Sequence, residues 1–334
     1  MSVRHLCLSS VFVAAGVLAG PAPNALKIAT IAPDGSSWMV EMRAAGVEIE
    51  KRTAGRVAFK FYPGGVMGND QSVQRKIRIG QLHGAAFPLG ALGEVYPDSR
   101  IWGLPMLFRS SAEVDALRQD FDAVFTGGLE AAGLVNFGFA EGGFANVMSV
   151  APLRTVADMK AQKVWVPEGD PVSYAMMQAL GVSPTTLPLT DVLTGLQTGL
   201  VNAVGASPLG AVAFQWHSRI RFVTEVPLVF LGGVFTIDKR AFSRLDAADQ
   251  PVVREVFTAT FHRLNLQNRR DNEQARAALV KNGVQFLMPA PDELARWQHA
   301  ADGVAARLAA EGQYDPALLK RFQERLARFR GGGR

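Results

Sequence analysis

The sequence predicts an α/β protein of two domains, and three observations support this prediction. The chain has 334 residues, of which 48% are hydrophobic and only 19% charged, so it can bury more than one core. Short β-rich runs alternate with amphipathic helical stretches, a pattern that favours a parallel-rich sheet. The alternation breaks near Gly142-Gly143 and then resumes, which indicates two α/β units of similar plan.

The first unit begins with an apolar, β-rich run at 26–32. A glycine-rich stretch at 63–68 lies between its second strand and second helix. The backbone N–H groups of this stretch either face a ligand or belong to a tight turn that needs positive φ, and both interpretations stay open. The other elements expected in this unit are strands at 57–62 and within 82–90 and helices near 36–52 and 69–80.

The second unit repeats the alternation. Residues 227–238 are apolar and β-like, and they lie where the chain can cross back to the first unit. We therefore assign 26–142 plus 231–270 to the first domain and 143–230 plus 271–330 to the second. The other elements expected in the second unit are strands at 146–150, 163–167 and 201–206 and helices near 170–180 and 190–199.

The longest helical pattern runs from Ala247 to about Lys281, with apolar residues at three- and four-residue spacings. Asp246 is the expected N-cap and Gly283 the expected C-terminal stop. At 1.5 Å per residue such a helix is about 50 Å long. Because this length exceeds the width of one small domain, we expect the helix to brace both domains. The elements expected after it are a strand at 284–289 and helices near 291–311 and 315–329.

Residues 1–19 are typical of a secretory signal peptide. They combine a short basic start with an apolar run and small residues before a cleavage point after Ala19. A lipoprotein needs a cysteine just after this run, but Pro21 stands there, so we expect a mature product that is freely soluble outside the inner membrane. Cys7 is the only cysteine, and its removal with the signal excludes a disulfide framework, a cysteine nucleophile and a thiolate zinc site.

The composition and the motifs disfavour several function classes. The net charge of +5 is spread over 35 basic and 30 acidic residues without a polybasic block, so no nucleic-acid partner is expected. No metal or cofactor is expected, because the five histidines lack metal-ligand spacing and the usual nucleotide-binding motifs are missing. Glu168 and Asp170 flank a glycine, so a secreted hydrolase or lyase that uses these two acids is the alternative to a binding protein.

Six segments of the chain form an ordered set of motifs. They are LKIATIAPDGSSW at 26–38 and the segments 48–68, 103–108, 163–171, 179–204 and 238–256. In this order and spacing they resemble the substrate-binding proteins of tripartite ATP-independent periplasmic (TRAP) transporters, of the dicarboxylate-binding (DctP) type. The resemblance extends from about Leu26 to about Gln313.

This resemblance implies a fold and a function. The fold is the two-domain periplasmic binding protein fold, type II-like, with a long helix that braces both domains. The function is that of a receptor, not an enzyme: it closes by a hinge around a small organic solute in the periplasm. The partners that the resemblance implies are this solute and the membrane permease subunits of a TRAP transporter.

Three polar positions depart from the family pattern. The family usually has an arginine in the K-x-R-V-P strand, where it clamps a ligand carboxylate, but Trp165 stands there. A second arginine commonly follows the G-F pair, where this chain has Ala145, and the polar run after L-Q-T-G is changed at 202–208. A tryptophan offers a flat face and one N–H donor instead of a charge. We therefore predict a ligand other than an ordinary small dicarboxylate: one with an apolar or aromatic body, a cationic group over the indole, or a carboxylate held elsewhere.

The family cleft, placed on this sequence, puts ten residues beside the ligand. Trp165 is the strongest candidate, because it ends a strand and opens a proline-containing loop, and ligands of α/β proteins bind outside the carboxyl ends of strands. The ten candidate ligand-binding residues are Trp38, Phe87, Leu89, Phe144, Asn146, Trp165, Glu168, Asp170, Leu189 and Ser207.

Overall fold

The computed structural model describes residues 24–332 of the chain. The predicted signal peptide, residues 1–19, lies outside these described residues. Within them, no helix is both long and apolar enough to cross a membrane.

The main sheet is mixed and has seven strands, in the order β2-β1-β3-β8-β4-β7, with β9 paired to β8. The pairs of β1 with β2 and with β3 are parallel, but β8 is antiparallel to both β3 and β4, and β4 is antiparallel to β7. The expectation of a parallel-rich sheet is therefore wrong for the centre of the sheet. The strands are β1 (Asn24–Thr30), β2 (Val57–Tyr62), β3 (Gly84–Pro88), β4 (Leu134–Ser149), β7 (Ala203–Ala206), β8 (Phe222–Asp238) and β9 (Gln285–Leu287).

Two long strands run through both halves of the molecule. β4 has 16 residues and β8 has 17, and they pair with each other from Leu134 to Ser149. The expected break at Gly142-Gly143 is wrong, because β4 continues through it with a register shift between Glu141 and Gly143. Gly143 adopts φ +85° there, which suits a β-bulge. The two halves are thus joined by continuous strands.

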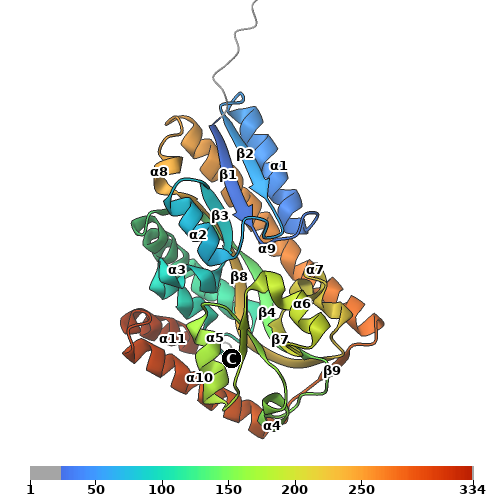
Figure 1. Cartoon of the computed structure of the whole chain (residues 1–334). Coiled ribbons are helices and arrows are strands. Elements are labelled where there is room, and N and C mark those ends of the chain that lie inside the picture. The colour runs from blue at the N-terminus through green and yellow to red at the C-terminus, as the bar shows by residue number, and fades with distance from the viewer. Residues whose placement is uncertain (1–23, 333–334) are drawn as a thin grey trace, which may run out of the picture.

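The first half carries the helices expected beside β1 to β3. In Figure 1, α1 lies beside β1 and β2, and α2 lies near β3. Both helices have side-chain N-caps, from Ser36 and Asn69. A further helix, α3, was not among the expected elements, and it packs against β4. The bounds are α1 (Ser37–Arg52), α2 (Asp70–Arg78), η1 (Leu89–Glu94), η2 (Pro97–Gly103), α3 (Ser111–Ala131) and α8 (Lys239–Phe242).

The second half holds a small two-stranded parallel sheet of β5 and β6. α10 packs against α5, and α11 packs against α3 of the first half; Figure 1 shows α10 and α11 together at one end. The bounds are α4 (Val156–Lys160), β5 (Trp165–Pro167), α5 (Pro171–Ala179), β6 (Thr185–Leu187), η3 (Leu189–Asp191), α6 (Val192–Thr198), α7 (Pro208–Ala213), η4 (Trp216–Ser218), α10 (Pro291–Ala310) and α11 (Pro316–Gly331).

The long helix α9 (Asp249–Lys281) has 33 residues and contacts α1 in one half and α7 in the other (Figure 1). The predicted brace is therefore confirmed, but its start is not. The N-cap is Ala248, and Asp246 accepts hydrogen bonds from the N–H groups of Asp249 and Gln250 through its backbone carbonyl. The expected side-chain cap by Asp246 is wrong, because α9 begins two residues later than predicted.

Three asparagine side chains of α9 form hydrogen bonds with the backbone of β4 at its bulge. Asn265 donates to the Phe139 carbonyl and accepts from the Glu141 N–H at 2.6 Å. Asn268 donates to the Glu141 carbonyl at 2.8 Å. Asn272 donates to the Gly142 carbonyl and accepts the Leu209 N–H of α7. The helix therefore holds the bulge and one element of the second half together.

Candidate functional site

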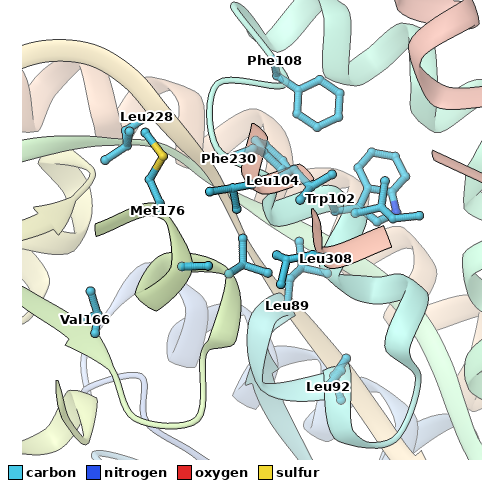
Figure 2. Close-up of a cluster of buried hydrophobic side chains, with 14 of the residues drawn as sticks. Leu89, Leu92, Trp102, Leu104, Phe108, Val166, Met176, Leu228, Phe230 and Leu308 are labelled. Atoms are coloured by element: carbon cyan, nitrogen blue, oxygen red, sulfur yellow. The ribbon is translucent and has the colours of Figure 1, made fainter. Parts of the chain in front are cut away.

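A cavity of about 250 Å³ lies where the two halves meet. The first half contributes the loop before α2 and residues of η1, and the second half contributes β5, β7 and the loops around them. β4 and β8 form the floor. Figure 2 shows four lining side chains, Leu89, Val166, Leu228 and Phe230, within the buried apolar cluster beside the cavity. Because both halves line it, a bound solute bridges them.

Six of the ten candidate residues line this cavity, and most of the remaining lining side chains are apolar. Trp165 is only 5% exposed, and its ring is perpendicular to that of Trp216 at a centroid distance of 5.4 Å. Its Nε1–H donates to the Leu187 carbonyl at 3.0 Å. Trp165 therefore offers the cavity an apolar ring, and its expected N–H donor is already used within the protein. The six residues are Leu89, Trp165, Glu168, Asp170, Leu189 and Ser207.

The other four candidates lie outside the lining. Phe144 and Asn146 alternate along β4 with Ala145 and Val147, and it is the latter two that face the cavity. The Asn146 side chain instead accepts the Val226 N–H.

The remaining two candidates belong to the core of the first half. Trp38 packs edge-to-face on Phe261 at 5.3 Å, and Phe87 is buried beside Ala85 and Ala29. The structure thus does not bring these two residues to the cavity.

The two carboxylates of the proposed acid/base pair are engaged in structural bonds. Asp170 is the N-cap of α5: it accepts the N–H groups of Val172 and Ser173 and the Ser173 hydroxyl, the last at 2.6 Å. Glu168 is exposed and accepts a hydrogen bond from Asn69 Nδ2 at 3.0 Å. These bonds account for both residues without any acid/base chemistry.

The glycine-rich stretch at 63–68 is a tight turn. Gly64, Gly65 and Gly68 have positive φ, and their N–H groups donate to the carbonyls of Ala32, Thr30 and Gly65. The alternative, in which these N–H groups face a ligand, is therefore wrong for three of them. The turn does place the residues that follow it beside the cavity.

Sequence reasoning missed six polar residues of the lining: Asn69, Asp70, Gln71, Arg100, Ser173 and Thr190. Burial raises the pKa of Asp70 to about 6, so in mildly acidic medium its carboxyl group can donate a hydrogen bond. Asn69 and Asp70 come directly after the glycine-rich stretch, which was the available signal for them. Arg100 lies in a 3-10 helix that the sequence did not predict.

The segments of the two halves that border the cavity entrance, around Asn69 and around Glu168, are in contact. Asn69 in the first half bonds Glu168 in the second. A Cβ atom on Gly65 would lie 2.6 Å from Thr190 Cγ2, so any larger residue at 65 would force the Thr190 side chain to move. The structure therefore has the cleft closed.

We expect Asn69→Asp to open the cleft with little loss of stability. Aspartate caps a helix as well as asparagine does, so α2 keeps its cap, but the donor to Glu168 is replaced by a repelling carboxylate. Repulsion at this exposed site is about 1 kcal/mol or less. Spin labels at Val66→Cys and Tyr174→Cys, both exposed positions, should report a longer distance between the halves.

Asn69→Asp combined with Glu168→Gln is the control for this experiment, and it should close the cleft again. An unchanged distance distribution in Asn69→Asp would show that this bond does not hold the two segments together.

The fold and the closed cleft between two α/β lobes define a solute-binding receptor. The family model described as bacterial extracellular solute-binding protein, family 7, matches residues 28–311. The chain belongs to this family, and it is a receptor and not an enzyme. The resemblance drawn from the sequence motifs is thereby confirmed.

Three known proteins illustrate the likeness. The C4-dicarboxylate-binding periplasmic protein DctP of Rhodobacter capsulatus is 23% identical over 269 residues, which cover 78% of this chain and 80% of that protein. The sugar acid binding protein DctPAm of Advenella mimigardefordensis, solved with galactonate, superimposes with a TM-score of 0.85 at 17% identity over 92% of this chain and 98% of that chain. A TRAP periplasmic solute binding protein of Desulfovibrio salexigens, solved with orotic acid, gives 0.81 at 20% identity over 91% and 99%.

Proposed function

We propose that this protein is a periplasmic receptor for an organic solute with an apolar or aromatic body. It binds the solute in the cleft between its halves, closes around it and delivers it to the permease subunits of a TRAP-type transporter. The proposed domains are 26–142 plus 231–270 and 143–230 plus 271–330, whose first boundary falls at the β4 bulge between Glu141 and Gly143.

The observation that carries this proposal is the apolar lining of the cavity around Trp165. Trp165 and Trp216 form one wall, and Leu189 and Phe230 also line the cavity. Such surfaces favour apolar and aromatic groups, because burying them removes apolar area from water. The same wall gives the two charges of a small dicarboxylate no compensation for the water that they would lose.

The known relatives named above bind acids: a C4-dicarboxylate, galactonate and orotic acid, by their descriptions. By the resemblance drawn from the sequence motifs, Trp165 stands where the family usually has the arginine that clamps a carboxylate, and Ala145 stands where a second arginine commonly lies. Both positions line the cavity. We therefore propose that this receptor accepts a different solute from the ordinary small dicarboxylates. Its proposed contacts are Leu89, Trp165, Leu189 and Ser207.

Thermal unfolding of the mature protein tests this specificity. Succinate, malate and fumarate at millimolar concentration should leave its Tm unchanged, whereas an apolar solute at a hundred times its Kd should stabilise it by about 2.7 kcal/mol. For a protein of this size that is a rise in Tm of several degrees. DctP of Rhodobacter capsulatus serves as the parallel control. Strong stabilisation of this chain by the dicarboxylates would contradict the proposal.

A further inference from the structure

One cation lines the cavity among the residues that the structure describes, and it is Arg100 of η2. Its side chain is only 8% exposed. A guanidinium keeps its positive charge even when it is buried, because its pKa lies far above neutrality. Burial of such a group without full compensation is costly. A buried arginine in the lining, where the other ionisable residues are the carboxylates Asp70, Glu168 and Asp170, therefore needs an explanation.

Arg100 has too few partners for its five N–H groups. Nη2 lies 3.3 Å from Glu94 Oε1, whose side chain is 69% exposed, and Nη1 donates to the Gln313 carbonyl at 3.3 Å. Both distances are beyond the usual range for N–H···O bonds. Within residues 24–332, the buried Nε of Arg100 has no partner, and the adjacent Ser99 hydroxyl has none either. Two neighbouring polar groups are thus buried without protein partners.

Arg100 lies between the cavity and a second, open groove. It lines the apolar cavity together with Gly103 and Leu228, and it also lines an open groove beside Glu94, Arg307 and Gln313. A Cβ on Gly93 would lie 2.5 Å from Arg100 Nε, so a glycine at 93 is what allows the guanidinium to rest there. Packing against Gly93 therefore buries Nε, while Nη1 and Nη2 each carry a second N–H beyond their bonds to Gln313 and Glu94.

We propose that Arg100 binds the acid group of the solute, so that the ligand is a monocarboxylate with an apolar body. This rests on the proposed function above and specifies the substrate class for the same cleft. A carboxylate can accept from the Nη donors that Arg100 leaves free, and it compensates the buried charge. The apolar body then lies along Leu89, Phe230 and Trp165.

The test compares acids with neutral molecules of the same shape. The probes are benzoate, phenylacetate, 3-phenylpropanoate, 4-methylpentanoate and hexanoate, each paired with its primary amide, and the measurement is the Kd by calorimetry. Wild type should bind at least one acid about 10- to 100-fold more tightly than its amide, since bonds to a charged partner are the strong ones. Arg100→Met should reduce this ratio to about one, and Arg100→Lys should keep part of it.

Glu94→Gln is the matched control, because it removes the ion pair of Arg100 but leaves the guanidinium in place. It should leave the ratio of acid to amide affinity unchanged or raise it. If Arg100 only holds η1 and Gln313 together, Arg100→Met and Arg100→Lys will weaken the binding of acids and amides alike. The ratio of acid to amide affinity will then stay the same. That result, or equal binding of acids and amides to wild type, overturns the proposal for Arg100 and leaves the proposed function standing. Failure of wild type to bind any acid or amide overturns both.

Discussion

Replacing Trp165 by alanine should lower the free energy of unfolding by about 3–5 kcal/mol and abolish solute binding. The side chain is 5% exposed, packs against Trp216 and bonds the Leu187 carbonyl. Its removal leaves a cavity in the second half and takes from the Leu187 carbonyl one of its two hydrogen bonds, the other being donated by the Glu168 N–H. Chemical denaturation measures the first effect, and a thermal-shift assay with the solute released from the native protein measures the second.

Trp165→Phe separates the two contributions. It keeps most of the apolar wall but removes the bond to Leu187, so we expect a loss of about 1–2 kcal/mol and binding weakened several-fold. Trp297→Phe is the matched control, because Trp297 is fully buried in α10 and does not line the cavity. It should cost stability and leave the Kd unchanged. Equal effects of both phenylalanine variants on the Kd would show that Trp165 acts only through the fold.

Local patterns in the sequence predicted several helices and short strands, although not α3. The predicted ranges 36–52 and 69–80 became α1 and α2, and 57–62 is β2 with the same bounds. These elements depend on period, caps and turn residues within a few positions. The two long strands were only partly predicted. A glycine pair was expected to end the strand, but in β4 Gly142 and Gly143 form a bulge through which the strand continues.

The site was harder to predict, because it depends on which side of each strand faces the cavity. The family position suggested Phe144 and Asn146, whereas Ala145 and Val147 line the cavity. A shift of one residue moves every side chain of a strand to the other face. Because of the bulge near Gly143, the sequence alone does not show which residues of β4 face the cavity. Arg100 could not be found locally at all, since its role arises from a 3-10 helix placed beside β8 by the tertiary fold.

Replacing Arg269 by methionine should destabilise the protein by about 3–5 kcal/mol, because it leaves a buried carboxylate without its partner. Arg269 of α9 reaches Glu141 through Nε and Nη2, at 2.9 and 2.7 Å, and holds Asp115 of α3 through two further bonds. The Glu141 side chain is only 3% exposed and lies at the β4 bulge. The hydrogen bonds that Arg269 donates to Asp115, and then to Glu141, raise its pKa, so the cation persists at every relevant pH.

Two variants show whether the buried charge is the cause. Arg263→Met, on the same helix, breaks an exposed pair with Glu41 and should cost no more than about 1 kcal/mol. Arg269→Met with Glu141→Gln should recover much of the loss, because the neutral amide can accept from Ser111 without a buried charge. Equal losses in the free energy of unfolding for Arg269→Met and Arg263→Met, measured in urea, would mean that the ion pair of Arg269 with Glu141 is no stronger than a surface pair. A large difference would mean that the buried ion pair between Arg269 and Glu141 stabilises the contact of α9 with β4 at the bulge, in addition to the bonds of Asn265, Asn268 and Asn272.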